Sequence, residues 1–368
     1  MIIFFKKKHF YMLLLTINIL FLIIIKKIND IKYNAYETKL LPKIGVLNNP
    51  KANYENLTFN NYSPVIFIGG VPRSGTTLMR SMLDAHPLVR CGQETRIIPR
   101  ILFIRNRWRF DNIEWKRILK AGITDEILDA AITSFINNIM VGHGEMAERL
   151  CNKDPYTLKN AVYLSKLYPN SKFILMVRDG RATVYSIMTR KVTITGFNLA
   201  NYTQCIQQWN FVINAMYNEC KTIGKERCMV VYYEQLILHP RKTMENVLNF
   251  LDLPWNETVL NHEKYIGKKI LLSNLERSSD QVIKPVNLDA LTKWVGNVPA
   301  YALHNMATLA PMLKFLGYDP EGNPPYYGSP DKDVLKKTED IHLHEKKWYN
   351  KAIKVAYNAY EVQKPKDI

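Results

Sequence analysis

A glycine-rich segment that follows a run of apolar residues is the first part of the sequence that predicts chemistry. Residues 65–80 read "VIFIGGVPRSGTTLMR". The part from Gly70 to Thr77 is similar to the phosphate-binding pattern G-x-x-x-x-G-K-[ST], except that Thr76 stands at the lysine position. A strand, a glycine turn and a helix direct backbone N–H groups and the positive end of the helix toward one anion. We therefore expect a phosphate site at which Arg73 supplies the cation.

The aspartate that holds Mg²⁺ in nucleotide triphosphatases is not evident after the later apolar runs. The run "FILMV" is followed by Arg178, and "VVYY" is followed by Glu234. The five cysteines show no C-x-x-C spacing, so no zinc site is expected either. The sequence therefore predicts phosphate binding without a metal and without transfer of a γ-phosphoryl group, which disfavours a P-loop kinase.

A second basic segment repeats the order of strand, loop and helix. Arg178 leaves an apolar run, and Ser186 and Arg190 lie four residues apart on one face of the expected helix. Two anion pockets without a Mg²⁺ site fit 3′-phosphoadenosine 5′-phosphosulfate (PAPS), whose product is 3′,5′-ADP. The first loop would hold the 5′-phosphosulfate, and the second would hold the 3′-phosphate.

Several longer segments make the sequence resemble the tyrosylprotein sulfotransferases. They are "PRSGTTLMRSMLDAHPLVRCGQETRIIPRIL", "NKDPYTLKN", "FILMVRDGRATVYSIMTRKVT", "VYYEQLILHPR" and "ERSSDQVIKPVNLDALTKW", and the similarity extends over residues 66–327. The resemblance implies a Golgi enzyme that moves the sulfuryl group of PAPS to tyrosine hydroxyls in acidic stretches of secretory and membrane proteins.

The resemblance also assigns roles to individual residues. It implies Glu94 as general base, and Arg73, Lys153 and Ser278 as the groups that stabilise the transferred sulfuryl group. Lys153 would then partly replace the missing P-loop lysine. The implied cofactor-binding residues are Arg73, Ser74, Gly75, Thr76, Thr77, Arg178, Ser186, Arg190, Tyr233, Ser278, Asp280, Gln281, Val282, Ile283, Lys284, Pro285, Val286, Asn287 and Lys293.

The proposed base has a coherent chemistry. A phenol with a pKa of about 10 is not ionised in the ground state by a carboxylate with a pKa of about 4.3. The phenol becomes more acidic as its bond to sulfur forms, so a positioned carboxylate can accept its proton in the transition state. The family usually has a second acid directly before the base, where this chain has Gln93.

A basic strip predicts how an acidic substrate is held. The formal net charge of the chain is +17, and residues 96–117 contain seven basic residues against Asp111 and Glu114. Such an excess favours polyanionic partners. The resemblance selects Arg96, Arg100 and Arg117 as substrate contacts. A nucleic-acid binder would also explain the charge, but no motif supports one.

The order of apolar runs and helical patterns predicts an α/β fold with a central parallel sheet flanked by helices. We expect strands at 65–70, 171–177 and 228–236. The expected organisation is a cytosolic tail (1–9), a transmembrane signal-anchor (10–25), a stem (26–62), a lumenal sulfotransferase domain (63–328) and a charged C-terminal tail (329–368). The pair His342 and His344 has no partner ligands there, so a solvated tail is expected rather than a metal site.

The N-terminal segment predicts a type II membrane protein. Its apolar residues are flanked by lysines on both sides, and no small-residue cleavage site follows. Asn-x-Ser/Thr sequons at Asn56, Asn61, Asn201 and Asn256 agree with a lumenal domain. The resemblance implies the disulfides Cys91–Cys151 and Cys220–Cys228, and a homodimer with Trp108 near its interface.

Two other functions would need only some of these residues. A carbohydrate sulfotransferase would keep both anion loops but would need neither the region of Glu94 nor the basic strip. A non-catalytic binder of acidic secretory proteins would need only the strip, and the retained Glu94, Arg73, Lys153 and Ser278 argue against it.

Overall fold

The computed structural model describes residues 59–273, 276–323 and 325–363, without the side chains of 356–363. The chain divides into two units, and all of the described residues lie in the second, Asn56–Ile368. The expected anchor at 10–25 and most of the stem lie outside the described residues. In the ranges that are described, no helix combines the length and the apolar character needed to cross a membrane.

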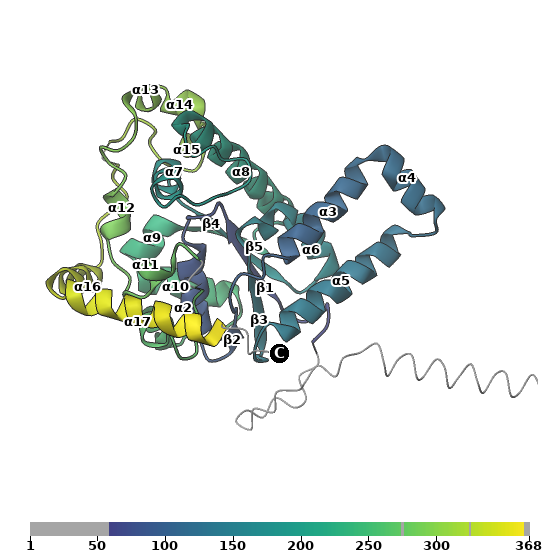
Figure 1. The fold of residues 1–368 in the computed structure, drawn as a ribbon, viewed down its shortest axis with the longest axis horizontal. Coiled ribbons are helices and arrows are strands. Elements are labelled where there is room, and N and C mark those ends of the chain that lie inside the picture. Colours follow the sequence, from purple (N-terminus) through teal and green to yellow (C-terminus); the bar gives the residue numbers. More distant parts are fainter. Residues whose placement is uncertain (1–58, 274–275, 324, 364–368) are drawn as a thin grey trace, which may run out of the picture. The chain divides into compact units, whose positions relative to one another are not determined.

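A parallel five-stranded sheet forms the centre of the second unit (Figure 1). The strand order is β2-β3-β1-β4-β5. Their bounds are β1 Ile66–Gly70, β2 Val89–Arg90, β3 Arg149–Lys153, β4 Lys172–Val177 and β5 Cys228–Tyr232. The expected strands correspond to β1, β4 and β5, although β5 ends earlier than predicted because the chain turns into helix α9 at Tyr233. Strands β2 and β3 were not expected from the sequence.

Helices connect successive strands. The bounds as far as the last strand are α2 Thr76–Ala85, α3 Ile98–Phe110, α4 Asn112–Lys120, α5 Asp125–Gly142, η1 Pro155–Asn160, α6 Ala161–Leu167, α7 Gly180–Thr189 and α8 Tyr202–Ile223. Those that follow are α9 Tyr233–Leu238, α10 Pro240–Phe250, η2 Glu257–Lys264, α11 Ser279–Val282, α12 Asp289–Thr292, α13 Ala300–Leu303, α14 Met306–Leu309, α15 Met312–Phe315, α16 Lys332–Leu343 and α17 Glu345–Gln363.

Two hydrophobic clusters form the core because alternate side chains of a strand point to opposite faces of the sheet. Phe67 of β1 belongs to one cluster, where it stacks on Phe173 of β4 with ring centroids 5.2 Å apart. Ile66 and Ile68 belong to the other cluster, which also contains Met79 of α2. Helix α2, which follows the glycine loop, is thereby fixed to the sheet by packing.

The C-terminal residues differ from the charged surface tail that the sequence predicted. Most of residues 332–363 form helices α16 and α17, which follow each other with one residue between them (Figure 1). Val334, Thr338 and Ile341 are buried at helical spacing and form one face of α16, and Trp348 is buried on α17. Charged residues stand between these buried residues in the sequence, so the overall composition of the segment does not indicate an apolar face.

Both disulfides implied by the resemblance are present. Cys91 is bonded to Cys151, and Cys220 of α8 is bonded to Cys228 of β5. The fifth cysteine, Cys205, is buried with a free thiol.

A buried ion pair attaches the second basic loop to the C-terminal part of the domain. The Asp179 carboxylate caps α7 and lies 2.8 Å from Nη2 of Arg181, and both side chains are 0% exposed. The hydroxyl of Tyr327 donates to the same carboxylate, and Arg181 donates to the carbonyl of Gly322. Removing one partner of such a pair leaves the other charge buried without compensation.

Arg181→Ala should therefore lower the free energy of unfolding by about 3–5 kcal/mol, measured by chemical denaturation. The matched control is Arg241→Ala, since Arg241 pairs with Glu257 on the surface and such a pair contributes about 0–1 kcal/mol. Equal losses in the two variants would contradict a structural role for the buried pair.

Candidate active site

A cavity of about 370 Å³ lies where β1, β4 and β5 end, which is where ligands bind in open parallel sheets. Most of the residues that the sequence assigned to the cofactor line it. They are Arg73, Gly75, Thr76, Thr77, Arg178, Arg190, Tyr233, Ser278, Asp280, Gln281, Val282, Lys284, Pro285, Val286, Asn287 and Lys293. Ser74, Ser186 and Ile283 are buried beside the cavity and are not among its lining residues.

The glycine loop presents the start of α2 to this cavity. The cap residue Gly75 has φ 96°, and no side chain caps the helix. A Cβ at this position would lie 2.4 Å from Cδ2 of Tyr233, so both the backbone angle and the close approach require glycine. The first N–H groups of α2 therefore have no side-chain acceptor and can bind an anion.

Arg73 connects the glycine loop with two other segments. Its backbone has φ 78°, a left-handed conformation that is uncommon outside glycine and often marks functional sites. Its guanidinium donates to Ser186 of α7, to Ser278 and to Gln281. Burial, with a further contribution from nearby Arg190, lowers the pKa of Arg73 to about 10, so the side chain remains charged at neutral pH.

The arginines of the second loop converge on the same cavity. Arg178 donates to the backbone carbonyl of Arg73 over 2.9 Å and lies over the ring of Tyr233. Arg190 pairs with the carboxylate of Asp280 at 2.8 Å. The two basic loops, which are more than a hundred residues apart in the sequence, thus form one cationic wall.

Beside the glycine loop, Lys153 lies between two carboxylates. Its side chain is 0% exposed, and Nζ lies 2.6 Å from Oε1 of Glu94 and 3.3 Å from Oε2 of Glu276. The same Nζ lies 3.4 Å from the hydroxyl of Thr77. Lys153 therefore reaches the phosphate loop from β3.

The pKa values of the two carboxyl groups, Glu94 and Glu276, are shifted in opposite directions. Burial raises the pKa of Glu94, and the charge of Glu276 raises it further, against the lowering effect of Lys153. Burial acts in the same direction on Glu276, but Lys153 and Arg80 outweigh it and lower the pKa of that carboxyl. A carboxylate with a raised pKa beside one that stays ionised is a common arrangement for proton transfer, and Glu94 is the member suited to accept a proton.

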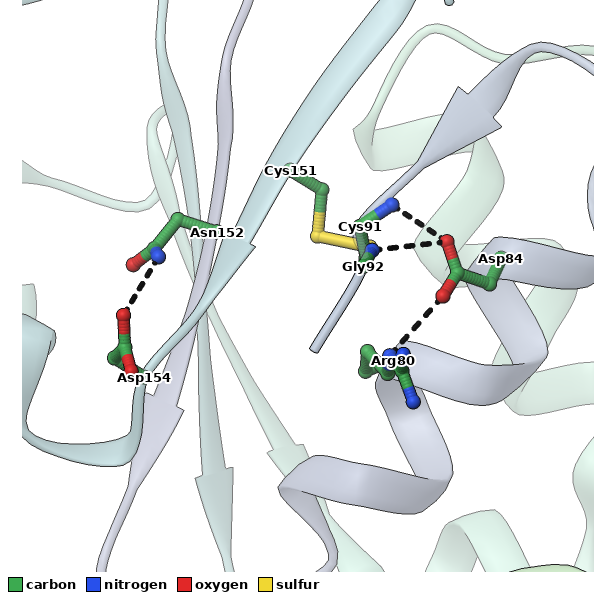
Figure 2. Close-up of a disulfide and its surroundings, with 7 residues drawn as sticks. All are labelled: Arg80, Asp84, Cys91, Gly92, Cys151, Asn152 and Asp154. Atoms are coloured by element: carbon green, nitrogen blue, oxygen red, sulfur yellow. Dashed lines mark hydrogen bonds and ion pairs between the residues drawn. A yellow bond between two sulfur atoms is a disulfide. The ribbon is translucent and has the colours of Figure 1, made fainter. Parts of the chain in front are cut away.

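A disulfide joins the loop of Glu94 to the strand of Lys153 (Figure 2). Cys91 is three residues before Glu94, and Cys151 is two residues before Lys153. Asp84 of α2 holds the same loop, because its carboxylate accepts from the backbone N–H groups of Cys91 and Gly92.

Asp154 holds the other side of the Glu94 loop. Its carboxylate accepts from the backbone N–H of Arg96 at 2.8 Å and from the hydroxyl of Thr95. Asn152 donates to the same carboxylate and fixes its orientation (Figure 2). The loop is therefore attached to β3 on both sides of Glu94.

The predicted substrate residues lie outside the cavity. Arg96, Arg100 and Arg117 are exposed, and Arg96 has φ 59°. Other members of the basic strip are engaged locally, since Arg105 lies over the ring of Tyr163 and Arg109 lies over that of Trp115. Arg117 itself pairs with Glu114 of the same helix at 3.4 Å, on the surface.

Some site residues were missed by the sequence analysis. Glu276 stands in the segment "ERSSDQ", but nothing in its spacing indicated that it would contact Lys153. Trp348 and its neighbours on α17 line the cavity, although the sequence predicted only a tail there.

His342 pairs with Asp289, and among the described residues no group of three or more metal-binding side chains is clustered.

Comparison with known proteins agrees with this geometry. The model of the sulfotransferase family matches residues 64–257. Protein-tyrosine sulfotransferase A of Caenorhabditis elegans is 59% identical over 83% of this chain and 81% of its own. Protein-tyrosine sulfotransferase 1 is 55% identical in Homo sapiens, over 80% of each chain, and 51% identical in Danio rerio, over 86% of this chain and 90% of its own.

The attachment of the Glu94 loop can be measured by hydrogen exchange. In the double variant Cys91→Ser/Cys151→Ser, amides in residues 91–97 should exchange about tenfold faster, because one of the attachments of the loop is lost. The double variant Cys220→Ser/Cys228→Ser removes a disulfide elsewhere and should leave these amides unchanged. Similar exchange of residues 91–97 in both variants would contradict the role assigned to Cys91–Cys151.

Proposed function

This chain belongs to the sulfotransferase family and, within it, to the protein-tyrosine sulfotransferases, and from this premise we propose that it transfers the sulfuryl group of PAPS to tyrosine hydroxyls of acidic protein segments. The observation that carries the proposal is the position of Glu94 and Lys153 beside an anion cavity that has a full set of cationic and hydroxyl groups.

PAPS fits the chemistry of the cavity. The glycine loop, with Arg73 and the start of α2, would hold the 5′-phosphosulfate, and Arg178 and Arg190 would hold the 3′-phosphate. The bound donor supplies an activated sulfuryl group. Ser186 acts on this site through its hydrogen bond to Arg73 rather than by lining the cavity.

Glu94 is proposed to accept the proton of the tyrosine hydroxyl. Its raised pKa makes it a stronger base than an exposed glutamate, while its position next to Lys153 keeps it available as a carboxylate. Lys153, Arg73 and Ser278 would stabilise the negative charge that develops on the transferred group and on the departing phosphate oxygen, the first two by their positive charge and Ser278 as a hydrogen-bond donor. Lys153 is close to Thr77 and therefore takes the role of the lysine that the loop lacks.

Acidic substrates are proposed to bind the exposed arginines Arg96, Arg100 and Arg117. Arg96 follows Glu94 by two residues, and its backbone is fixed by Asp154. A carboxylate next to the target tyrosine can thus be held close to the base. Such contacts are exposed, so binding should weaken with increasing salt.

The proposed setting is the Golgi lumen, with the segment 10–25 as a type II membrane anchor. Two disulfides are consistent with an oxidising compartment. A homodimer is supported by exposed apolar side chains on α3 and α4 near Trp108, among them Phe103, Phe110 and Ile113.

Glu94→Gln should lower kcat about 10²–10⁴-fold while 3′,5′-ADP still binds, because the proton acceptor is lost but the anion cavity is retained. The assay uses labelled PAPS with an acidic peptide that carries one tyrosine. A matched peptide with phenylalanine and a sugar acceptor should remain unlabelled. Label on the sugar would indicate a carbohydrate sulfotransferase, and donor binding without any transfer by the native enzyme would indicate a non-catalytic binder.

Glu276→Gln should move the acid limb of the kcat–pH profile to lower pH. The charge of Glu276 raises the pKa of Glu94, so its removal lowers that pKa, and Glu94 becomes deprotonated at lower pH. We expect a shift of about half a pH unit to one unit. Glu226→Gln, on the exposed surface, is the control and should leave the profile unchanged. A shift of the acid limb to higher pH in Glu276→Gln would contradict the arrangement of the two carboxyl groups.

A further inference from the structure

The lining of the main cavity has two chemically different parts. One part contains the cations and hydroxyls of the two basic loops. The other part is mostly apolar or aromatic and includes Leu78, Ile237, Val286 and, from α17, Trp348, Tyr349 and Ala352, with Glu345 at the start of the same helix. A nucleotide donor has a matching division, because its phosphates need cations whereas its base is a flat ring that is favourably buried against apolar and aromatic groups. The apolar part, with α17, is therefore the place for the base.

Several contacts hold α16 and α17 against this part of the cavity. Lys351 of α17 donates to the backbone carbonyl of Glu263 over 2.7 Å. Ala352 and Val355 pack against the hydrophobic cluster that also contains α2. In α16, the hydroxyl of Thr338 accepts from the backbone N–H of Leu288. The wall that α17 forms is thus part of the folded domain.

A second contact ties α16 to the lining of the cavity itself. Asp289, which lines the cavity, lies 2.8 Å from Nε2 of His342. The two C-terminal helices are therefore joined to the segment that follows the proposed nucleotide-binding residues 278–287.

Trp348 is the residue of α17 best suited to contact a base. Its side chain is 7% exposed, and its indole N–H is buried without a hydrogen-bond partner. The N–H is closed off from the cavity, so only the part of the indole ring that lines the cavity can contact a base. Nζ of Lys347 and Nζ of Lys351 lie 5.6 Å and 5.1 Å from the centroid of this ring. The indole ring also offers an aromatic surface on which a base can pack.

We propose that α17 forms the base-binding wall of the donor site and that Trp348 contacts the adenine. This assignment rests on the proposed function, since the adenine belongs to PAPS and its product. It makes helix α17 a determinant of nucleotide specificity. The phosphates are bound by the two basic loops, whereas the identity of the base is read by a helix close to the C-terminal end of the chain.

Isothermal titration calorimetry with two ligands separates these contributions. The ligands are 3′,5′-ADP and ribose 3,5-bisphosphate, which has the same phosphate positions and no base. Trp348→Ala should weaken binding of 3′,5′-ADP by about tenfold or more and leave the affinity for ribose 3,5-bisphosphate unchanged. Trp255→Ala, at a partly exposed tryptophan that does not line the cavity, is the matched control and should change neither.

The other outcomes are also decisive. An unchanged affinity for 3′,5′-ADP in Trp348→Ala, or an equal loss for both ligands, would overturn the proposal. If Trp348→Ala does not fold, Trp348→Leu takes its place, because it keeps an apolar side chain but removes the aromatic ring. It should weaken binding of 3′,5′-ADP alone, and no selective loss would again overturn the proposal. Absence of 3′,5′-ADP binding by the native protein would instead contradict the proposed function.

Discussion

A lysine that is completely buried at the end of a strand needs an opposite charge beside it, because an unpaired ammonium in a protein interior is very unfavourable. Lys153 is such a residue, and Glu94 and Glu276 provide the charge. Neither carboxylate comes from the strand that carries the lysine. The Glu94 loop must therefore be held against β3, and this is the role of Cys91–Cys151 and of the Asp154 carboxylate.

The order of strands explains how Lys153 can replace a P-loop lysine. β3 is a neighbour of β1 in a parallel sheet, and Lys153 is paired with Ile68, two residues before the glycine loop begins. The carboxyl ends of both strands lie at the same edge, so a side chain at the end of β3 reaches the start of α2. The cation is thus supplied by the adjacent strand, and it forms an ion pair with Glu94, the proposed base.

The sequence predicted those parts of the structure in which a local pattern decides the conformation. The apolar runs before Gly70 and Arg178 are buried strands, and residues of both basic loops line one cavity. Glu94 and Lys153 were assigned only by resemblance, because no local pattern distinguishes them from surface residues. Strand β3 was missed because "RLCNK" has little apolar character, and α17 was missed because its buried residues are spaced among charges.

If Glu94 and Lys153 act as one unit, as their direct contact implies, a double-mutant cycle in kcat tests this coupling most directly. Glu94→Gln, Lys153→Met and the double variant are compared with the native enzyme under identical conditions. Mutual dependence predicts that the double variant loses little more activity than the more damaging single variant. If the free-energy losses of the single variants simply add, the two residues act independently, and the coupling of base and cation is contradicted.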